Sequence, residues 1–145
     1  MITMFIAATN DHCVMIEVSA GIVKTKGKIL AMKKGQSKHD YLSYKYEFPG
    51  GKVEIGEKPI EALKREFKEE LKTDISNAKI EQLSDVVYDY PDFSVRIFPF
   101  VIEVENFIFE MTEHIDYQWV EMSSLMNIEW VEADKIIAER LVKNK

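Results

Sequence analysis

The sequence has one cysteine and no long apolar run, and both absences limit what the chain can be. Cys13 has no second cysteine to pair with, so no internal disulfide can form, and we expect a small buried or edge residue in a reducing compartment. No run of about eighteen apolar residues predicts a membrane span. The first ten residues lack the basic start, apolar stretch and cleavage site of a secretory signal. We therefore expect a cytoplasmic protein without a membrane partner.

Positive charge is also scarce. The chain has 19 Lys and Arg against 25 Asp and Glu, a formal net charge of −6. Because a phosphate polymer is bound by clustered basic side chains, we expect no nucleic-acid polymer as partner. A small anionic ligand remains compatible with this charge if metal ions supply the missing positive charge.

Length and composition are those of one globular domain, which we expect to span residues 1–145. Strand-like and helical patterns alternate without an internal repeat or linker, which predicts an α/β fold with a mixed sheet covered by helices. Residues 1–13 form an extension for which the sequence leaves three interpretations open: an extra edge strand, a tail or a start-site artefact.

The expected strands are apolar, β-branched stretches bounded by turn residues. They are residues 14–23, 28–32, 78–90, 94–104 and 117–121. The first two form a hairpin, and a tight turn at 90–93 joins the next two. The polar segment 33–45 is expected to be a loop long enough to be functional.

Two helices are expected from apolar residues three and four positions apart. The first begins at Pro59, whose missing N–H suits a first helical turn, and ends near residues 72–74. Its buried stripe is Ile60, Leu63, Phe67 and Leu71. The second covers residues 131–142, with a stripe of Ala133, Ile137 and Leu141.

Three carboxylates share one side of the first helix, away from its apolar stripe. They are Glu66, Glu69 and Glu70. Like charges at these spacings destabilise a helix by about 0.2–0.5 kcal/mol per pair, so a bound divalent cation would relieve the repulsion. Several hard oxygen ligands favour Mg²⁺ or Mn²⁺. The alternative is a solvated acidic face neutralised by neighbouring basic side chains.

The segment 51–73, GKVEIGEKPIEALKREFKEELKT, closely resembles the Nudix box. In that motif a glycine is followed after five residues by Glu, and after seven more by Arg-Glu, an apolar residue, any residue and Glu-Glu. The matching positions are Gly51, Glu57, Arg65, Glu66, Phe67, Glu69 and Glu70. One departure is Lys72-Thr73, where the family usually has glycine and an aliphatic residue. This change concerns the end of the helix and not the carboxylates.

The resemblance is closest to MutT-like nucleoside triphosphate pyrophosphohydrolases and covers residues 15–142. It implies a Nudix fold, in which a mixed β-sheet is sandwiched between helices (α/β/α), and hydrolysis of a nucleoside triphosphate to monophosphate and pyrophosphate by metal-activated water. The implied ligands of Mg²⁺ or Mn²⁺ are the Gly50 carbonyl and the carboxylates of Glu66, Glu69, Glu70 and Glu113.

The resemblance also implies roles for supporting residues around the metal. Glu69 or Glu113 acts as the general base, and no motif distinguishes them. Arg65 is expected to pair with a carboxylate, with Glu57 and Glu69 both as candidate partners, and Glu57 is expected to cap the helix N-terminus.

A base pocket is implied by the same resemblance. Its expected lining is Lys34, Phe48, Lys52, Tyr90, Phe93 and Asp134. An ionised Asp134 only accepts hydrogen bonds, which suits an exocyclic amine and favours a cytidine-type triphosphate, followed by oxidised purine triphosphates. Each aromatic residue could instead belong to the core.

Other functions remain open on the sequence. They include a nucleotide-binding sensor without catalysis, a structural acidic domain, and hydrolysis of dinucleoside polyphosphates, ADP-ribose or nucleotide sugars. The histidines, His12, His39 and His114, have no metal spacing and are expected to be loop residues. No serine lies in a nucleophile elbow. The partner is expected to be a small nucleotide, and the protein a monomer or a homodimer.

Overall fold

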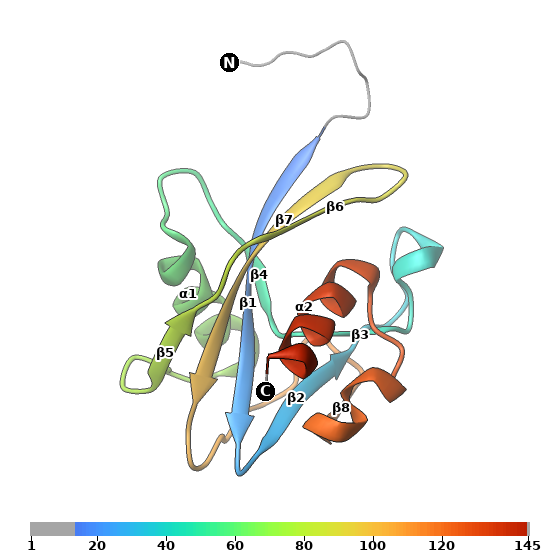
Figure 1. Cartoon of the computed structure of the whole chain (residues 1–145). Helices are drawn as coiled ribbons and strands as arrows, with labels where there is room; N and C mark the ends of the chain where they lie inside the picture. The colour runs from blue at the N-terminus through green and yellow to red at the C-terminus, as the bar shows by residue number, and fades with distance from the viewer. Residues whose placement is uncertain (1–13, 145) are drawn as a thin grey trace.

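A computed structural model describes residues 14–144, whose strands form one eight-stranded mixed sheet (Figure 1). The main order is β3-β2-β1-β7-β5, while β4 pairs with β1, β6 with β7 and β8 with β2. The strands are β1 Met15–Thr25, β2 Lys28–Lys33, β3 Tyr46–Glu47, β4 Gly50–Lys52, β5 Lys79–Gln82, β6 Val86–Asp89, β7 Ser94–Glu103 and β8 Asp116–Glu121. The predictions for the extension 1–13, with His12 and Cys13, lie outside the described residues.

The predicted first hairpin is confirmed, but its two strands soon separate. Lys26 and Gly27 both have positive φ angles, 53° and 78°, which matches a two-residue hairpin turn. Only two residue pairs join β1 to β2, and β2 then pairs with β8 and β3. The edge of β1 that is left open pairs with β4, which carries Gly50 and Gly51. The parting of β1 and β2 therefore brings the glycine pair beside the central strand.

The predicted strand 78–90 is wrong in one respect, because it is divided into β5 and β6. Both pieces pair with β7, but Gln82 faces Phe100 and Val86 faces Ile97. Three residues, 83–85, thus stand opposite two, 98 and 99, which is a β-bulge. Pro99 lies at this point and has no N–H to donate to a neighbouring strand. The proline explains why continuous pairing stops there.

A helix covers each face of the sheet, as the sequence predicts. Helix α1 Pro59–Leu71 buries Leu63, Phe67 and Leu71 on one face, while Ile60 is half-buried. Helix α2 Glu132–Lys143 buries Ala133 and Ile137 on the other. Successive strand residues serve opposite faces, so neighbours on β1 belong to different clusters.

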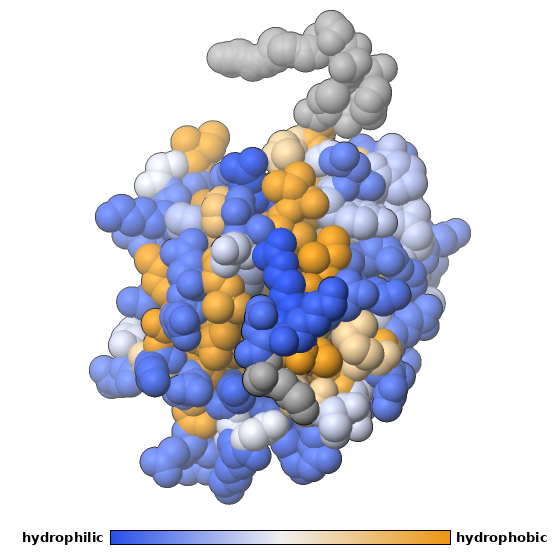
Figure 2. All heavy atoms as spheres, viewed as in Figure 1, coloured by the Kyte–Doolittle hydropathy of each residue, from blue (hydrophilic) through white to orange (hydrophobic). Residues whose placement is uncertain are grey.

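The α2 side of the molecule has a mixed surface. In Figure 2, apolar side chains reach the surface in bands beside α2, between hydrophilic ones. Within residues 14–144, neither helix is long and apolar enough to cross a membrane.

The C-terminal end of α1 forms a left-handed cap without the usual glycine. Lys72 takes φ 56° and ψ 36°, and the N–H of Thr73 donates to the Phe67 carbonyl at 3.1 Å. The departure from the box at Lys72-Thr73 therefore leaves the helix end intact.

Candidate functional site

The glycine pair on β4 lies against both the central strand and α1. A Cβ atom on Gly50 would overlap the backbone of Ser19, and Gly50 has a φ of 157°. A Cβ atom on Gly51 would overlap the carboxyl group of Glu66. Glycine therefore lets the backbone approach β1 at position 50 and the carboxylate-bearing helix at position 51.

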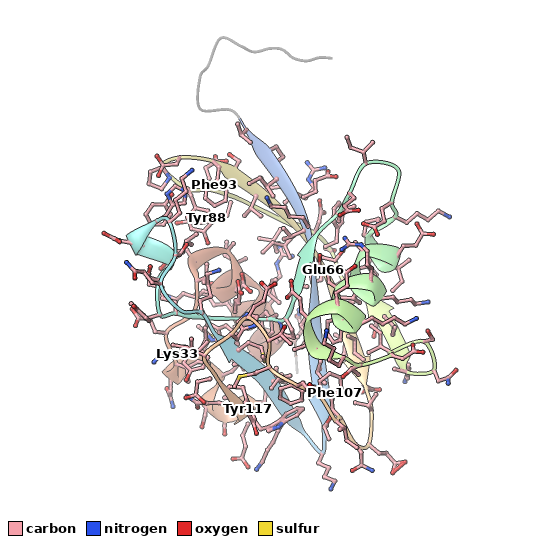
Figure 3. The ribbon with its side chains drawn as sticks, turned by 180° about the vertical axis from the view of Figure 1, so that it is seen from behind. Lys33, Glu66, Tyr88, Phe93, Phe107 and Tyr117 are labelled. Carbon is pink, nitrogen blue, oxygen red and sulfur yellow. The ribbon has the colours of Figure 1, made fainter. Side chains whose placement is uncertain are left out.

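Two carboxylates of α1 face a cleft beside this turn. Glu66 and Glu70 line a cavity of about 490 Å³ together with Gly50 and with Glu113 from the loop before β8. Figure 3 shows Glu66 between α1 and the strand beside it. The structure thus brings four of the five expected metal ligands to one place.

Negative charge accumulates in this cleft. Burial raises the pKa of Glu70 to about 8, assisted by a hydrogen bond with the Glu66 side chain. The charges of Glu113 and Glu47 raise this pKa in the same direction. A bound cation would favour the ionised form of Glu70 and so oppose this rise in pKa.

The residues present fit a divalent metal ion by their chemistry. Carboxylates and a backbone carbonyl are hard oxygen donors, the type that Mg²⁺ and Mn²⁺ prefer. Among the described residues, no three His, Cys, Asp or Glu side chains are arranged with metal-ligating geometry. Side chains of the cleft would therefore have to adjust when a cation binds.

Glu69 differs from the other carboxylates of α1. Its side chain is 61% exposed, and it contacts Arg65 Nη1 at 3.3 Å. It lines neither this cavity nor the adjoining polar cavity of about 250 Å³ that contains Glu70 and Glu113. The structure therefore does not bring Glu69 to the cleft.

Arg65 joins the helix to the segment before it. Its Nε lies 2.7 Å from Glu57 and its Nη1 lies 2.7 Å from Glu66, so the expected pairing with Glu57 is present. Hydrogen bonds from Arg65, followed by the N–H of Glu54, lower the pKa of Glu57 to about 2. The expectation that Glu57 caps the helix is wrong, because the helix begins at Pro59 with Lys58 as the capping residue. The carboxylate of Glu57 accepts hydrogen bonds from Arg65 instead.

The wall of the same cavity also includes apolar side chains. Four of the expected base-pocket residues line the cavity: Lys34, Phe48, Lys52 and Asp134. Sequence reasoning missed Val18, Ala20 and Ile97, whose side chains come from β1 and β7. Alternation along these strands predicts which side chains share a face of the sheet. The cavity also requires Phe48, which is distant in sequence and belongs to the same buried cluster as Ala20 and Ile97.

Tyr90 and Phe93, also expected in the base pocket, lie outside the cavity. Tyr90 is 8% exposed, and its hydroxyl accepts a hydrogen bond from the N–H of Ala133 at 2.9 Å. Phe93 stacks against His39 with 5.6 Å between ring centroids. Figure 3 shows Phe93 and Tyr88 at one end of the molecule, well away from Glu66. These aromatic side chains support the β6–β7 hairpin and the start of α2.

Asp134 is buried at the cavity wall, with 7% of its surface exposed. Its Oδ2 accepts a hydrogen bond from the N–H of Phe48 at 2.9 Å. Burial, followed by the charge of Glu47, raises the pKa of Asp134 to about 8. This rise in pKa favours the protonated carboxyl group over the ionised acceptor expected from the sequence.

We expect the Asp134→Asn variant to become more stable than the parent as pH rises. A carboxyl group whose pKa is raised by folding loses stabilising free energy between its unfolded pKa, about 4, and its folded pKa, about 8. Asparagine stays neutral and avoids this loss. Urea unfolding without cations at pH 5, 7 and 9 should show a growing difference. A difference independent of pH would contradict the assignment.

Two residues beside the cleft, His114 and Glu47, are given no individual role by the sequence, although the segment 47–52 resembles the entry to the metal site of the family. His114, expected to be a loop histidine, has 8% of its side chain exposed, and its Nε2 lies 2.8 Å from Oε2 of Glu47. The same carboxylate oxygen lies 3.7 Å from Nζ of Lys34. Glu47 and His114 are 67 positions apart, so only the folded chain brings them together.

The family model described as NUDIX domain matches residues 15–141. The chain therefore belongs to the Nudix family, which confirms the resemblance carried by the box. Of the solved structures, the crystal structure of the MutT protein from Methanosarcina mazei Go1 superposes with a TM-score of 0.78. The superposition covers 92% of this chain and 97% of the Methanosarcina chain, with 21% sequence identity. This similarity supports the fold alone.

Two curated relatives are enzymes of Escherichia coli strain K12. The 8-oxo-dGTP diphosphatase is 28% identical over 89 residues, which cover 61% of this chain and 66% of that protein. The CTP pyrophosphohydrolase is 50% identical over 58 residues, which cover 39% of this chain and 41% of that protein. The match thus spans less than two thirds of the length of either relative.

Proposed function

We propose that the protein hydrolyses a nucleoside triphosphate to a nucleoside monophosphate and pyrophosphate, with Mg²⁺ or Mn²⁺ as cofactor. The observation that carries this proposal is the convergence of Gly50, Glu66, Glu70 and Glu113 on one cavity whose wall also includes the apolar side chains of Val18, Ala20, Phe48 and Ile97. Family membership supports it, because the relatives named above act on nucleoside triphosphates.

In this proposal the carbonyl of Gly50 and the carboxylates of Glu66, Glu70 and Glu113 hold the cation. A bound divalent cation supplies charge neutralisation for the phosphate oxygens and lowers the pKa of the attacking water. Lys34 and Lys52 line the cleft and add positive charge for the phosphate chain. Glu69, a ligand by the resemblance, would have to leave Arg65 to take part.

We favour Glu113 over Glu69 as the general base. Glu113 lines both the main cleft and the adjoining polar cavity, next to Glu70. Both residues are exposed, but Glu69 lines neither cavity and contacts Arg65 instead. A base must come within hydrogen-bond reach of the proton that it removes, and Glu113 meets that condition with less rearrangement.

A cytidine-type triphosphate is the substrate that the cavity fits best. Phe48 offers an apolar face, packed on Trp130 with 4.5 Å between ring centroids. A protonated Asp134 can donate a hydrogen bond from its hydroxyl group and accept one, a combination that complements N3 and the exocyclic amine of cytosine. The name of the CTP pyrophosphohydrolase agrees with this choice. Oxidised guanine triphosphates are the second candidate, because of the relative named 8-oxo-dGTP diphosphatase.

A panel of nucleoside triphosphates assayed with Mg²⁺ tests this function. We expect CTP or its deoxy form to have the highest kcat/KM, and release of pyrophosphate with each monophosphate. An absence of cleavage, with nucleotide still bound, would favour the sensor interpretation instead. A preference for dinucleoside polyphosphates or nucleotide sugars would place the protein elsewhere in the family.

The same panel on Asp134→Asn tests how the base is recognised. Asparagine carries one donor group and one acceptor, as a protonated Asp134 does, and its oxygen would keep the hydrogen bond from Phe48. We therefore expect the CTP-to-UTP ratio of kcat/KM to stay within about threefold of the parental ratio, since no polar group is left unpaired. Asp134→Leu removes both groups and should lower this ratio about tenfold or more, since an unpaired polar group costs about 1–3 kcal/mol. A parental ratio in Asp134→Leu would show that Asp134 does not recognise the base.

A further inference from the structure

The loop between β7 and β8 is fixed on both sides of Glu113. The hydroxyl of Thr112 donates a hydrogen bond of 2.6 Å to the carbonyl of Glu70 on α1. The ring of His114 lies 2.8 Å from the carboxylate of Glu47 on β3. Each neighbour of Glu113 is thus tied to a different wall of the cleft.

Further hydrogen bonds run along the same loop at a greater distance from Glu113. The N–H of Glu110 donates to the Leu71 carbonyl at 2.9 Å, and the hydroxyl of Thr73 donates to the Ile108 carbonyl at 2.7 Å. The N–H of Ile115 donates to the Lys33 carbonyl at 2.9 Å. The last carbonyls of a helix have no partner within it, so the loop satisfies groups that α1 leaves open. These bonds would hold the loop even without Thr112.

We propose that Thr112 and His114 are positioning residues that fix the carboxylate of Glu113 opposite Glu70. Thr112 ties the backbone next to Glu113 to the helix turn that carries Glu70, so the two carboxylates keep their separation. His114 is mostly buried and ties the other side to Glu47. This inference rests on the proposed role of Glu113 in hydrolysis.

The two contacts differ from ordinary loop packing in what their loss would do. Thr112 is exposed, so removal of its hydroxyl uncovers little buried surface. The same change removes the hydrogen bond that joins the loop beside Glu113 to the carbonyl of Glu70. His114 shares the Glu47 carboxylate with Lys34, so its loss would also change the charge facing the cleft. Supporting hydrogen bonds of this kind around metal sites affect affinity or activity by about 10–100-fold.

The test compares Thr112→Val with Thr112→Ser, and His114→Leu with His114→Gln. We expect the Val and Leu variants to lower kcat by about 10–100-fold with CTP and Mg²⁺, while KM changes by less than about threefold. The Ser and Gln variants retain a hydrogen-bond donor and should recover most of the rate. Binding of Mn²⁺ alone, followed by electron paramagnetic resonance, should weaken in the Val and Leu variants as well.

Thr73→Val provides the matched control. It removes a hydroxyl that bonds to the same loop at Ile108, away from Glu113, and should leave kcat unchanged. A loss of rate equal to that of Thr112→Val would show that general loosening of the loop explains both results. Circular dichroism and thermal unfolding verify that each variant is folded.

A Glu113→Gln background separates this inference from the proposed function. If Glu113→Gln keeps full turnover, the proposed role of Glu113 is wrong. If it slows turnover, Thr112→Val should add nothing further in that background, because the residue acts through Glu113. Losses that simply add, or a Thr112→Val variant with parental kcat and parental Mn²⁺ binding, would overturn the positioning role.

Discussion

The Glu70→Gln variant should lose about a thousandfold in kcat and at the same time give a more stable cation-free protein. The rate falls because stabilisation of transition-state charge by a metal ion is worth several kcal/mol, and each 1.4 kcal/mol is a factor of ten. Stability rises because burial, followed by the neighbouring Glu66, Glu113 and Glu47, raises the pKa of Glu70, so its ionisation in the cation-free folded state is unfavourable. Glutamine keeps the size of the side chain, stays neutral and avoids this loss of stability.

Steady-state assays and thermal unfolding with and without Mg²⁺ measure both effects. The parent should gain Tm when Mg²⁺ is added, since a ligand that binds only the folded state stabilises it, whereas the variant should gain little. Glu81→Gln, an exposed glutamate of β5, is the control and should change neither quantity. Parental turnover by Glu70→Gln at saturating Mg²⁺ would remove the basis of the proposed function.

The Gly51→Ala variant should remain folded but lose about a hundredfold in kcat. An added methyl group would overlap the carboxyl group of Glu66, the far end of a side chain that can move aside. The backbone of Gly51 itself has no positive φ, so alanine introduces no backbone strain there. Displacement of a reacting or metal-binding group by about 1 Å is enough for a loss of this size.

Gly56→Ala is the control for this experiment. Gly56 has a φ of 84° and open space around it, so alanine should cost about 1–2 kcal/mol of stability while kcat stays unchanged. The two variants should thus show opposite patterns, with lost activity in one and lost stability in the other. Unchanged kcat in Gly51→Ala would mean that Glu66 can move without consequence for the reaction.

Features that depend on neighbouring residues were predictable from the sequence. The spacing of Glu66 and Glu70 placed both on one side of a helix, and Pro59 marked its beginning. The turn after Tyr90 also formed as predicted, with its N–H bonded to the Phe93 carbonyl. Local spacing determines these features because each depends on residues a few positions apart.

Features that depend on distant residues were not predictable. Glu69 shares a side with Glu66 by spacing, but its contact with Arg65 keeps it on the outer surface. The raised pKa of Asp134 depends on its burial, and the N–H that it binds belongs to Phe48, 86 positions away. Tyr90 is an aromatic residue of the type that lines base pockets, yet its hydroxyl accepts a hydrogen bond from the N–H of Ala133 at the start of α2. Each outcome requires knowledge of which segments pack together.

The bulge opposite Pro99 gives β7 two independent partners. One hairpin arm, β6, pairs with the half of β7 that supplies Ile97 to the base cavity, while β5 pairs with the other half in a different register. Because the registers are separate, a change of length in the β6–β7 arm need not shift β5 or the strands behind α1. The cavity wall that carries Ile97 can therefore change without moving the helix that carries Glu66 and Glu70.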